Sequence, residues 1–126
     1  MDAVSPLMET AAQREQEYIE AARLALDAAG IPKTVVVMLQ PIADSNGSHG
    51  FWSEHPIVYL DYVEVPRRHR RRGLGSQVMT ILTGLADDRE IALALRAASH
   101  RSEDFFFKFG FAGSGRMLRD PQRGGK

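Results

Sequence analysis

A run of basic residues followed at once by closely spaced glycines is the part of this sequence best suited to chemistry. Residues 67–76 read Arg-Arg-His-Arg-Arg-Arg-Gly-Leu-Gly-Ser and follow an apolar segment that ends at Val65. A helical pattern begins at Leu74, so the unpaired amides of a helix start would lie beside the arginines. Glycines let a phosphate approach the backbone, and arginines add charge-assisted hydrogen bonds. The segment therefore predicts a pyrophosphate-binding turn formed by Arg70, Arg71, Arg72, Gly73, Leu74, Gly75 and Ser76.

Two common phosphate loops are excluded by inspection of the same segment. Residues 73–78 lack the third glycine of a dinucleotide-binding fingerprint, and no Gly-Lys-Ser or Gly-Lys-Thr sequence occurs in the chain. A solvated basic patch and a nucleic-acid-binding module are the alternatives, because six consecutive basic residues would neutralise several phosphates. No aromatic side chains interleave with the arginines to stack on bases, and charge alone does not explain the glycines. We therefore favour the phosphate turn.

The turn resembles the Gln/Arg-x-x-Gly-x-Gly/Ala motif of the GNAT superfamily of acyl-CoA N-acyltransferases. Arg70, Gly73 and Gly75 occupy its fixed positions. Downstream, residues 105–111 resemble the Phe-Tyr-x-Lys-x-Gly-Phe signature of the same family, and the two motifs have the right separation. Together the resemblance spans roughly residues 57–119. It implies an N-acetyltransferase that moves an acetyl group from its cosubstrate acetyl-CoA to a primary amine by direct attack.

The resemblance also implies which residues would hold the cosubstrate. In such proteins the strand before the motif parts from its neighbour, and its backbone pairs with the pantetheine arm. Val63 and Val65 would supply those backbone groups here, and an amide near Val65 would polarise the thioester carbonyl. Ser99 corresponds to a frequent asparagine of the family, and Phe106 to a tyrosine that often protonates the leaving thiolate.

Phe106 separates two hypotheses about activity, because phenylalanine has no proton to give. In an active enzyme, water, Ser99, His100 or Ser102 would have to replace the tyrosine. The alternative is a catalytically inactive domain that binds coenzyme A or a macromolecular partner. The acceptor stays open among protein amino termini, lysines, polyamines, antibiotics and small metabolites.

The proton acceptor of related enzymes often lies on the strand before the motif, at positions that correspond to Tyr59 and Asp61. Period-two alternation places Tyr59, Asp61, Val63 and Val65 on one face and Val58, Leu60, Tyr62 and Glu64 on the other. Apolar neighbours desolvate a carboxylate, which makes it a stronger proton acceptor. Asp61 is therefore our first candidate for the catalytic base, and Glu64 the second. Either carboxylate could instead discourage edge-to-edge aggregation or pair with an arginine.

The elements that must position these residues alternate between helices and strands. Ser5 and Pro6 predict the start of an amphipathic helix, which Gly30 and Pro32 end. Apolar runs predict buried strands over 34–39, which Pro41 terminates, over 57–65 and over 91–95. The last two flank a helical pattern, so they should form a parallel pair with a right-handed crossover. A short helix over 102–109, ended by Gly110, and a last strand over 111–119 complete the order.

We therefore expect an α/β fold with a mixed, twisted sheet flanked by helices, the GNAT fold, in a single domain of residues 1–126. The polar stretch 42–56 contains Phe51 and Trp52, so this loop could cover a pocket. His49, Glu54 and His55 could help to shape an acceptor site there, or the loop could fold over its own aromatics. The family's first strand and last hairpin strand have no clear counterpart, so a homodimer could complete the sheet.

Composition restricts the partners and cofactors. The formal net charge is zero, so no overall field attracts nucleic acid or a membrane surface. Cysteine is absent, and the four histidines do not pair at the spacing of a helical zinc motif, so we expect no metal. The first residues form neither a signal peptide nor a membrane span, which favours a cytoplasmic protein.

Overall fold

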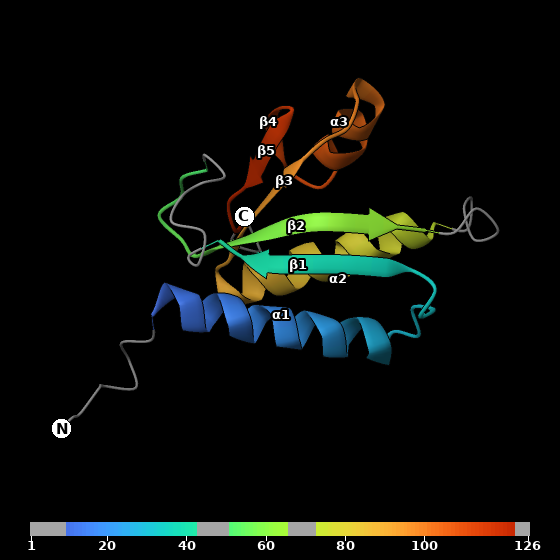
Figure 1. Cartoon of the computed structure of the whole chain (residues 1–126), viewed down its shortest axis with the longest axis horizontal. Helices are drawn as coiled ribbons and strands as arrows, with labels where there is room; N and C mark the ends of the chain where they lie inside the picture. The colour runs from blue at the N-terminus through green and yellow to red at the C-terminus, as the bar shows by residue number, and fades with distance from the viewer. Residues whose placement is uncertain (1–9, 43–50, 66–72, 123–126) are drawn as a thin grey trace.

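The computed structural model of the chain describes residues 10–42, 51–65 and 73–122. Over these residues it has three helices and five strands, in the order α1 (Ala11–Ala28), β1 (Val36–Pro41), β2 (Ile57–Glu64), α2 (Leu74–Arg89), β3 (Ala92–Arg96), α3 (His100–Phe107), β4 (Ala112–Ser114) and β5 (Arg116–Arg119) (Figure 1). The strands form one sheet with the order β1-β2-β3-β5-β4. β2 and β3 are parallel, and the other neighbouring pairs are antiparallel. The predicted mixed sheet with flanking helices is confirmed.

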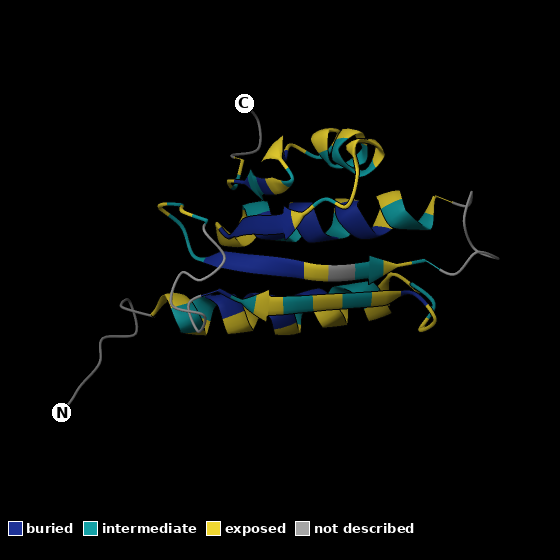
Figure 2. Cartoon of the chain, turned by 45° about the horizontal axis from the view of Figure 1, so that its top comes forward, coloured by how far each residue is buried: buried dark blue, intermediate teal, exposed yellow. Residues whose placement is uncertain are grey.

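The main core lies between the sheet and the two long helices. Tyr18 and Ala22 of α1 pack with Met79 and Leu82 of α2 against the strands. The Tyr18 hydroxyl donates a hydrogen bond of 2.8 Å to the Leu82 carbonyl, which satisfies a polar group inside this core. Figure 2 shows β2 buried along its first half and more exposed toward its end. The exposed end of β2 is therefore the part of the strand available to a ligand.

α1 begins later than the sequence signals predict. Thr10 caps it, because its hydroxyl accepts from the Gln13 amide at 3.1 Å and the Gln13 side chain accepts from the Thr10 amide at 2.9 Å. This reciprocal capping box gives an acceptor to the backbone amides of both Thr10 and Gln13, and it fixes Ala11 as the first residue of the helix. Ser5 and Pro6, the predicted start, lie outside the described residues. The predicted end is confirmed, since Gly30 takes a left-handed conformation with φ of 78°.

β1 is an edge strand, so the prediction of a buried strand is wrong. Among the described strands it pairs with β2 alone, and its inward and outward residues alternate in exposure. Val37 and Leu39 pack against the main core, whereas the side chain of Met38 is 49% exposed. Pro41 is the last residue of the strand rather than a residue beyond it. An edge strand tolerates proline because its outer row of amides is not needed for pairing.

The carboxyl-terminal segment is a hairpin, β4 and β5, and not the single strand predicted over 111–119. Gly113 and Gly115 have positive φ angles of 124° and 72°, which an L residue rarely adopts. Because β4 and β5 form this hairpin, the expectation that the last hairpin strand has no counterpart is also wrong. α3 is shifted by two residues from the predicted 102–109, because Ser99 caps it and His100 is its first residue.

Candidate functional site

β2 and β3 part from each other at their carboxyl ends. Within the described residues they are paired where Ile57, Val58 and Tyr59 meet residues 92–94. β2 nevertheless continues to Glu64, and β3 continues to Arg96. The two strands therefore leave a gap in the sheet, as the resemblance to the acyltransferase family implied.

Two adjoining cavities occupy this gap. The first, of about 240 Å³, reaches the start of α2 and is lined there by Val65, Gly75 and Phe105; we call it the α2-side cavity. The second, of about 270 Å³, is lined by Asp61 and Arg96 among others; we call it the Asp61 cavity. The two cavities share the three lining residues Val63, Ser102 and Phe106. A ligand that enters at α2 can therefore meet a second ligand beside Asp61.

A bulge in β2 places Asp61 at the second cavity. Met38 of β1 pairs with Tyr62, and the next residue, Leu39, pairs with Leu60. Asp61 is thus an extra residue with no partner of its own on β1. Such a bulge bends the strand and changes the direction of its side chains.

The bulge also reverses the alternation of β2, so the predicted grouping of its faces is wrong. Leu60 packs in the main core before the bulge, and Val63 and Val65 pack against the same core after it. Tyr59, which was predicted to share a face with these valines, packs in a second cluster with Ile57 and Ala94. One inserted residue shifts a period of two by one position, which exchanges the two faces.

Asp61 and Glu64, the two candidate bases, are both exposed. Asp61 accepts a hydrogen bond of 2.9 Å from the Gln40 side chain and lines the cavity that bears its name. The predicted desolvation of Asp61 by apolar neighbours is wrong, because the bulge turns its side chain away from the main core. Glu64, at the end of β2, lines neither cavity among the described residues.

The start of α2 has the backbone geometry that the turn requires. Gly73 precedes the helix with φ of 72°, a left-handed conformation that favours glycine. The first bond of the helix runs from the Gln77 amide to the Gly73 carbonyl at 2.9 Å. The amides of Leu74, Gly75 and Ser76 therefore have no acceptor within the helix. Arg70, Arg71 and Arg72, the basic half of the predicted turn, lie outside the described residues.

α3 supplies one wall of the gap. Phe106 and Ser102 line both cavities. Ser99 has a structural role, since its hydroxyl caps α3 by accepting from the Ser102 amide at 3.2 Å. The ring of His100 is 96% exposed and lies 3.1 Å from Glu103. Among the side chains considered as replacements for the family's tyrosine, the structure brings Ser102 alone into the cavities of the described chain.

The described loop residues around Trp52, which could have shaped an acceptor site, line neither cavity of the gap. Phe51 packs on Tyr59 of β2 with ring centroids 6.1 Å apart, so this part of the loop covers an aromatic side chain of the strand. Glu54 and His55 line a different cavity, of about 440 Å³, beside the start of α1. His49 lies outside the described residues. A further groove, of about 650 Å³, runs between the end of α1 and β1 and shares no lining residue with the two cavities of the gap.

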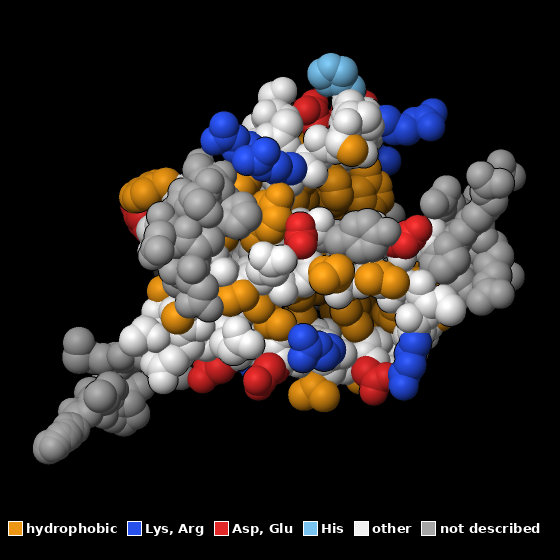
Figure 3. Space-filling view, in the orientation of Figure 1, with side chains coloured by type: hydrophobic (Ala, Val, Ile, Leu, Met, Phe, Trp, Pro, Cys, Tyr) orange, Lys and Arg blue, Asp and Glu red, His pale blue; other side chains and the backbone are white. Residues whose placement is uncertain are grey.

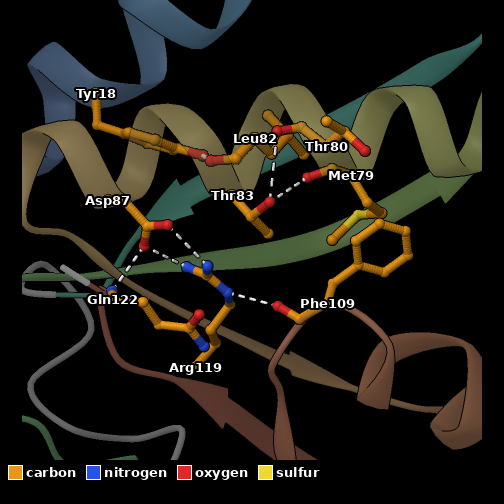
Figure 4. A network of polar contacts seen from close by, with 9 residues as sticks. All are labelled: Tyr18, Met79, Thr80, Leu82, Thr83, Asp87, Phe109, Arg119 and Gln122. Atoms are coloured by element: carbon orange, nitrogen blue, oxygen red, sulfur yellow. Dashed lines mark hydrogen bonds and ion pairs between the residues drawn. The ribbon is translucent and has the colours of Figure 1, made fainter. Parts of the chain in front are cut away.

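A partly buried ion pair joins the elements around the gap (Figure 4). Arg119 of β5 binds Asp87 of α2 through two hydrogen bonds of 2.8 and 3.0 Å. The same guanidinium donates to the Phe109 carbonyl at 2.6 Å, and the Gln122 amide donates to Asp87 at 2.7 Å. Partial burial raises the pKa of Asp87, but the hydrogen bonds from Arg119 and Gln122 outweigh it and lower the pKa overall. The pair fixes the end of α3 against α2, and with it Phe106.

The comparisons with known proteins point to one family. The model of the acetyltransferase (GNAT) family matches residues 36–111, which run from the start of β1 to the residue before β4. A search of curated proteins finds no match. Within the described residues, no group of His, Cys, Asp and Glu side chains is arranged to hold a metal ion. No helix of the described chain has both the length and the apolar character needed to cross a membrane.

Proposed function

The chain belongs to the acetyltransferase (GNAT) family, and from this premise we propose that it transfers an acetyl group from acetyl-CoA to a primary amine. The parting of β2 and β3 carries the proposal, because it leaves two adjoining cavities in the sheet. Direct transfer needs two substrates that meet at one point. Val63, Ser102 and Phe106, which line both cavities, would surround that point.

The start of α2 suits the diphosphate of acetyl-CoA. Three successive amides lack an acceptor within the helix and lie at the positive end of its dipole. Gly75 is not required by the packing of the protein, since an added Cβ would only make an ordinary contact of 3.7 Å with Phe105. A glycine there is instead explained by a ligand that approaches the backbone. Arg70, Arg71 and Arg72 would add guanidinium donors, and the pantetheine arm would lie along Val63 and Val65.

Asp61 would act as the catalytic base. The amine nitrogen attacks the carbonyl carbon of the thioester and forms the new C–N bond, while the C–S bond breaks and its electron pair leaves with the sulfur. The proton released by the nitrogen passes to the Asp61 carboxylate, whose place on the cavity wall puts it within reach of the amine. Glu64 remains the second candidate.

Ser102 would replace the family's tyrosine at the leaving group. Its hydroxyl would donate a proton to the coenzyme A thiolate and recover one from water. The Ser102 amide, rather than its hydroxyl, completes the cap of α3, so the hydroxyl can change partner without loss of the cap. The alternative is a domain that binds coenzyme A without turnover, which the absence of a hydroxyl on Phe106 favours.

The test measures binding and turnover separately. Acetyl-CoA should raise the melting temperature of the purified protein, because a ligand that binds only the folded state stabilises it. Thiol release in the presence of a panel of primary amines should then reveal an acceptor. Asp61→Ala should lower kcat/KM for that amine by about 100-fold or more, whereas Asp88→Ala, at an exposed position on α2, should have no effect.

Each result separates the two functions. A stabilising effect of acetyl-CoA without thiol release from any amine would select the binding domain. Turnover that is equal in the Asp61 and Asp88 variants would exclude Asp61 as the base.

A further inference from the structure

Two arginines lie directly opposite each other at the end of the gap. Arg96 of β3 pairs in register with Arg116 of β5, and both side chains are exposed. Residues directly opposite on antiparallel strands point to the same face, and like charges in such a pair are destabilising. In the described part of the chain, neither guanidinium has a hydrogen bond or ion pair to offset this repulsion. The described part of the protein therefore gives no structural reason for the pair.

The arginines share a face of the sheet with Asp61. The neighbouring pair, Leu95 and Met117, is buried in the main core, so alternation places Arg96 and Arg116 on the face away from α1 and α2. Asp61 is bonded to Gln40, whose partner Tyr59 belongs to the cluster on that same face. In Figure 3, acidic side chains lie over β2 and basic side chains over the β3 and β5 side of the sheet.

The two kinds of charge meet at one cavity. Asp61 and Arg96 both line the Asp61 cavity, and no ion pair joins them in the described structure. The Asp61 carboxylate, which suits an amine, therefore lies across a small space from the Arg96 guanidinium, which suits an anion. Arg116 lies beside this cavity as the register partner of Arg96. The volume of about 270 Å³ is below the range of about 300–1,000 Å³ of drug-sized sites, which points to a small molecule.

We propose that Arg96 and Arg116 bind an oxyanion carried by the acceptor amine, while Asp61 faces its amino group. This inference rests on the proposed function and names its acceptor class, a small amine with a carboxylate or phosphate group. Guanidinium groups suit both anions, because their planar forks donate two parallel hydrogen bonds. The anion would also offset the repulsion between the two arginines.

Calorimetric titration tests the anion site without turnover. β-Alanine is compared with ethylamine, and phosphoethanolamine with ethanolamine, so that each pair differs in the anion and the two pairs distinguish carboxylate from phosphate. The full chain should bind an anionic member at least about ten-fold more tightly than its neutral counterpart. Arg96→Gln and Arg116→Gln should lose this preference, and Arg101→Gln, on the exposed side of α3, should keep it. The variants should unfold at the same temperature or higher, since repulsion is removed.

Equal binding within both pairs, or a preference that survives both arginine substitutions, would overturn the inference. Turnover measurements distinguish a failure of the anion site from a failure of the proposed function. Acetylation of neutral amines with no preference for anionic ones would overturn the anion site alone. Binding of the anion by a protein that acetylates no amine would overturn the proposed function alone.

Discussion

At the scale of single residues, Phe106 stands where the resemblance to the family implied a tyrosine. It lies where the two cavities adjoin, with Ser102 as the nearby hydroxyl that lines both. A ring without a hydroxyl can shape the cavity but cannot deliver a proton. In the proposed reaction the leaving thiolate would then be protonated by Ser102 or by water, which predicts a slow enzyme.

Phe106→Tyr should accordingly raise kcat by about ten-fold or more, because a positioned acid is supplied at the leaving group. Ser102→Ala should lower kcat in the natural sequence and have less effect in the Phe106→Tyr background. Thiol release under saturating acetyl-CoA measures both. Thr80→Ala, on the exposed side of α2, is the control. If Ser102→Ala lowered kcat equally in both backgrounds, Ser102 would not be the proton donor.

At the scale of elements, the middle of α2 packs in the core, whereas its first turn is the proposed binding site of the diphosphate. Val78, Met79 and Leu82 are buried, whereas Gly73 and Ser76 are exposed. Substitutions in the first turn can therefore change binding without affecting the fold. The helix dipole makes this end of α2 electrically positive. A single acidic substitution can test whether that positive end binds the diphosphate.

Ser76→Glu should raise or preserve the melting temperature, because a negative charge in the first turn of a helix is favourable. The same charge should weaken acetyl-CoA binding by about ten-fold or more, since it repels the diphosphate. Titration calorimetry and thermal unfolding give the two values on one sample. Thr80→Glu, one turn later, should leave binding unchanged. A variant of Ser76 that binds acetyl-CoA normally would place the diphosphate away from this helix start.

At the scale of the whole molecule, the Asp87 and Arg119 pair joins α2, β5 and the end of α3. Arg119 is buried, so loss of its partner would leave an uncompensated charge in the interior. Burial also raises the pKa of Tyr18, whose hydroxyl thus stays neutral in the adjacent core. These contacts hold in place α3, the wall of the gap that carries Phe106 and Ser102.

The folded state lowers the pKa of Asp87, so the unfolded chain binds more protons in acid. The stabilisation is present above the ordinary aspartate pKa of about 3.9 and is lost as the pH falls below it. Asp87→Asn should lower the free energy of unfolding at neutral pH by about 1–3 kcal/mol, less than for a fully buried pair because the Asp87 side chain is 25% exposed. Urea unfolding from pH 7 to 3 measures this, and Asp88→Asn should match the natural protein. An unchanged acid dependence in Asp87→Asn would exclude the pair as its source.

The sequence by itself determined the elements near the site. The β-branched run before Val65, the helical spacing from Leu74 and the apolar run from Ile91 are local patterns, and they correctly predicted a strand, a helix and a parallel strand. Gly73 was also correctly expected at the start of the helix. Each of these signals depends on residues only a few positions apart.

The tertiary structure alone decided how those elements open a site. The bulge at Asp61 exists because β2 pairs with β1, more than 20 residues earlier, with a shift in register between Met38 and Leu39. Arg96 and Arg116 meet because β3 and β5 are neighbours, although a helix and a hairpin strand separate them in the chain. Register and strand order follow from contacts between distant segments, which no local pattern records. The faces of β2, the exposure of Asp61 and the arginine pair were therefore beyond prediction from periodicity.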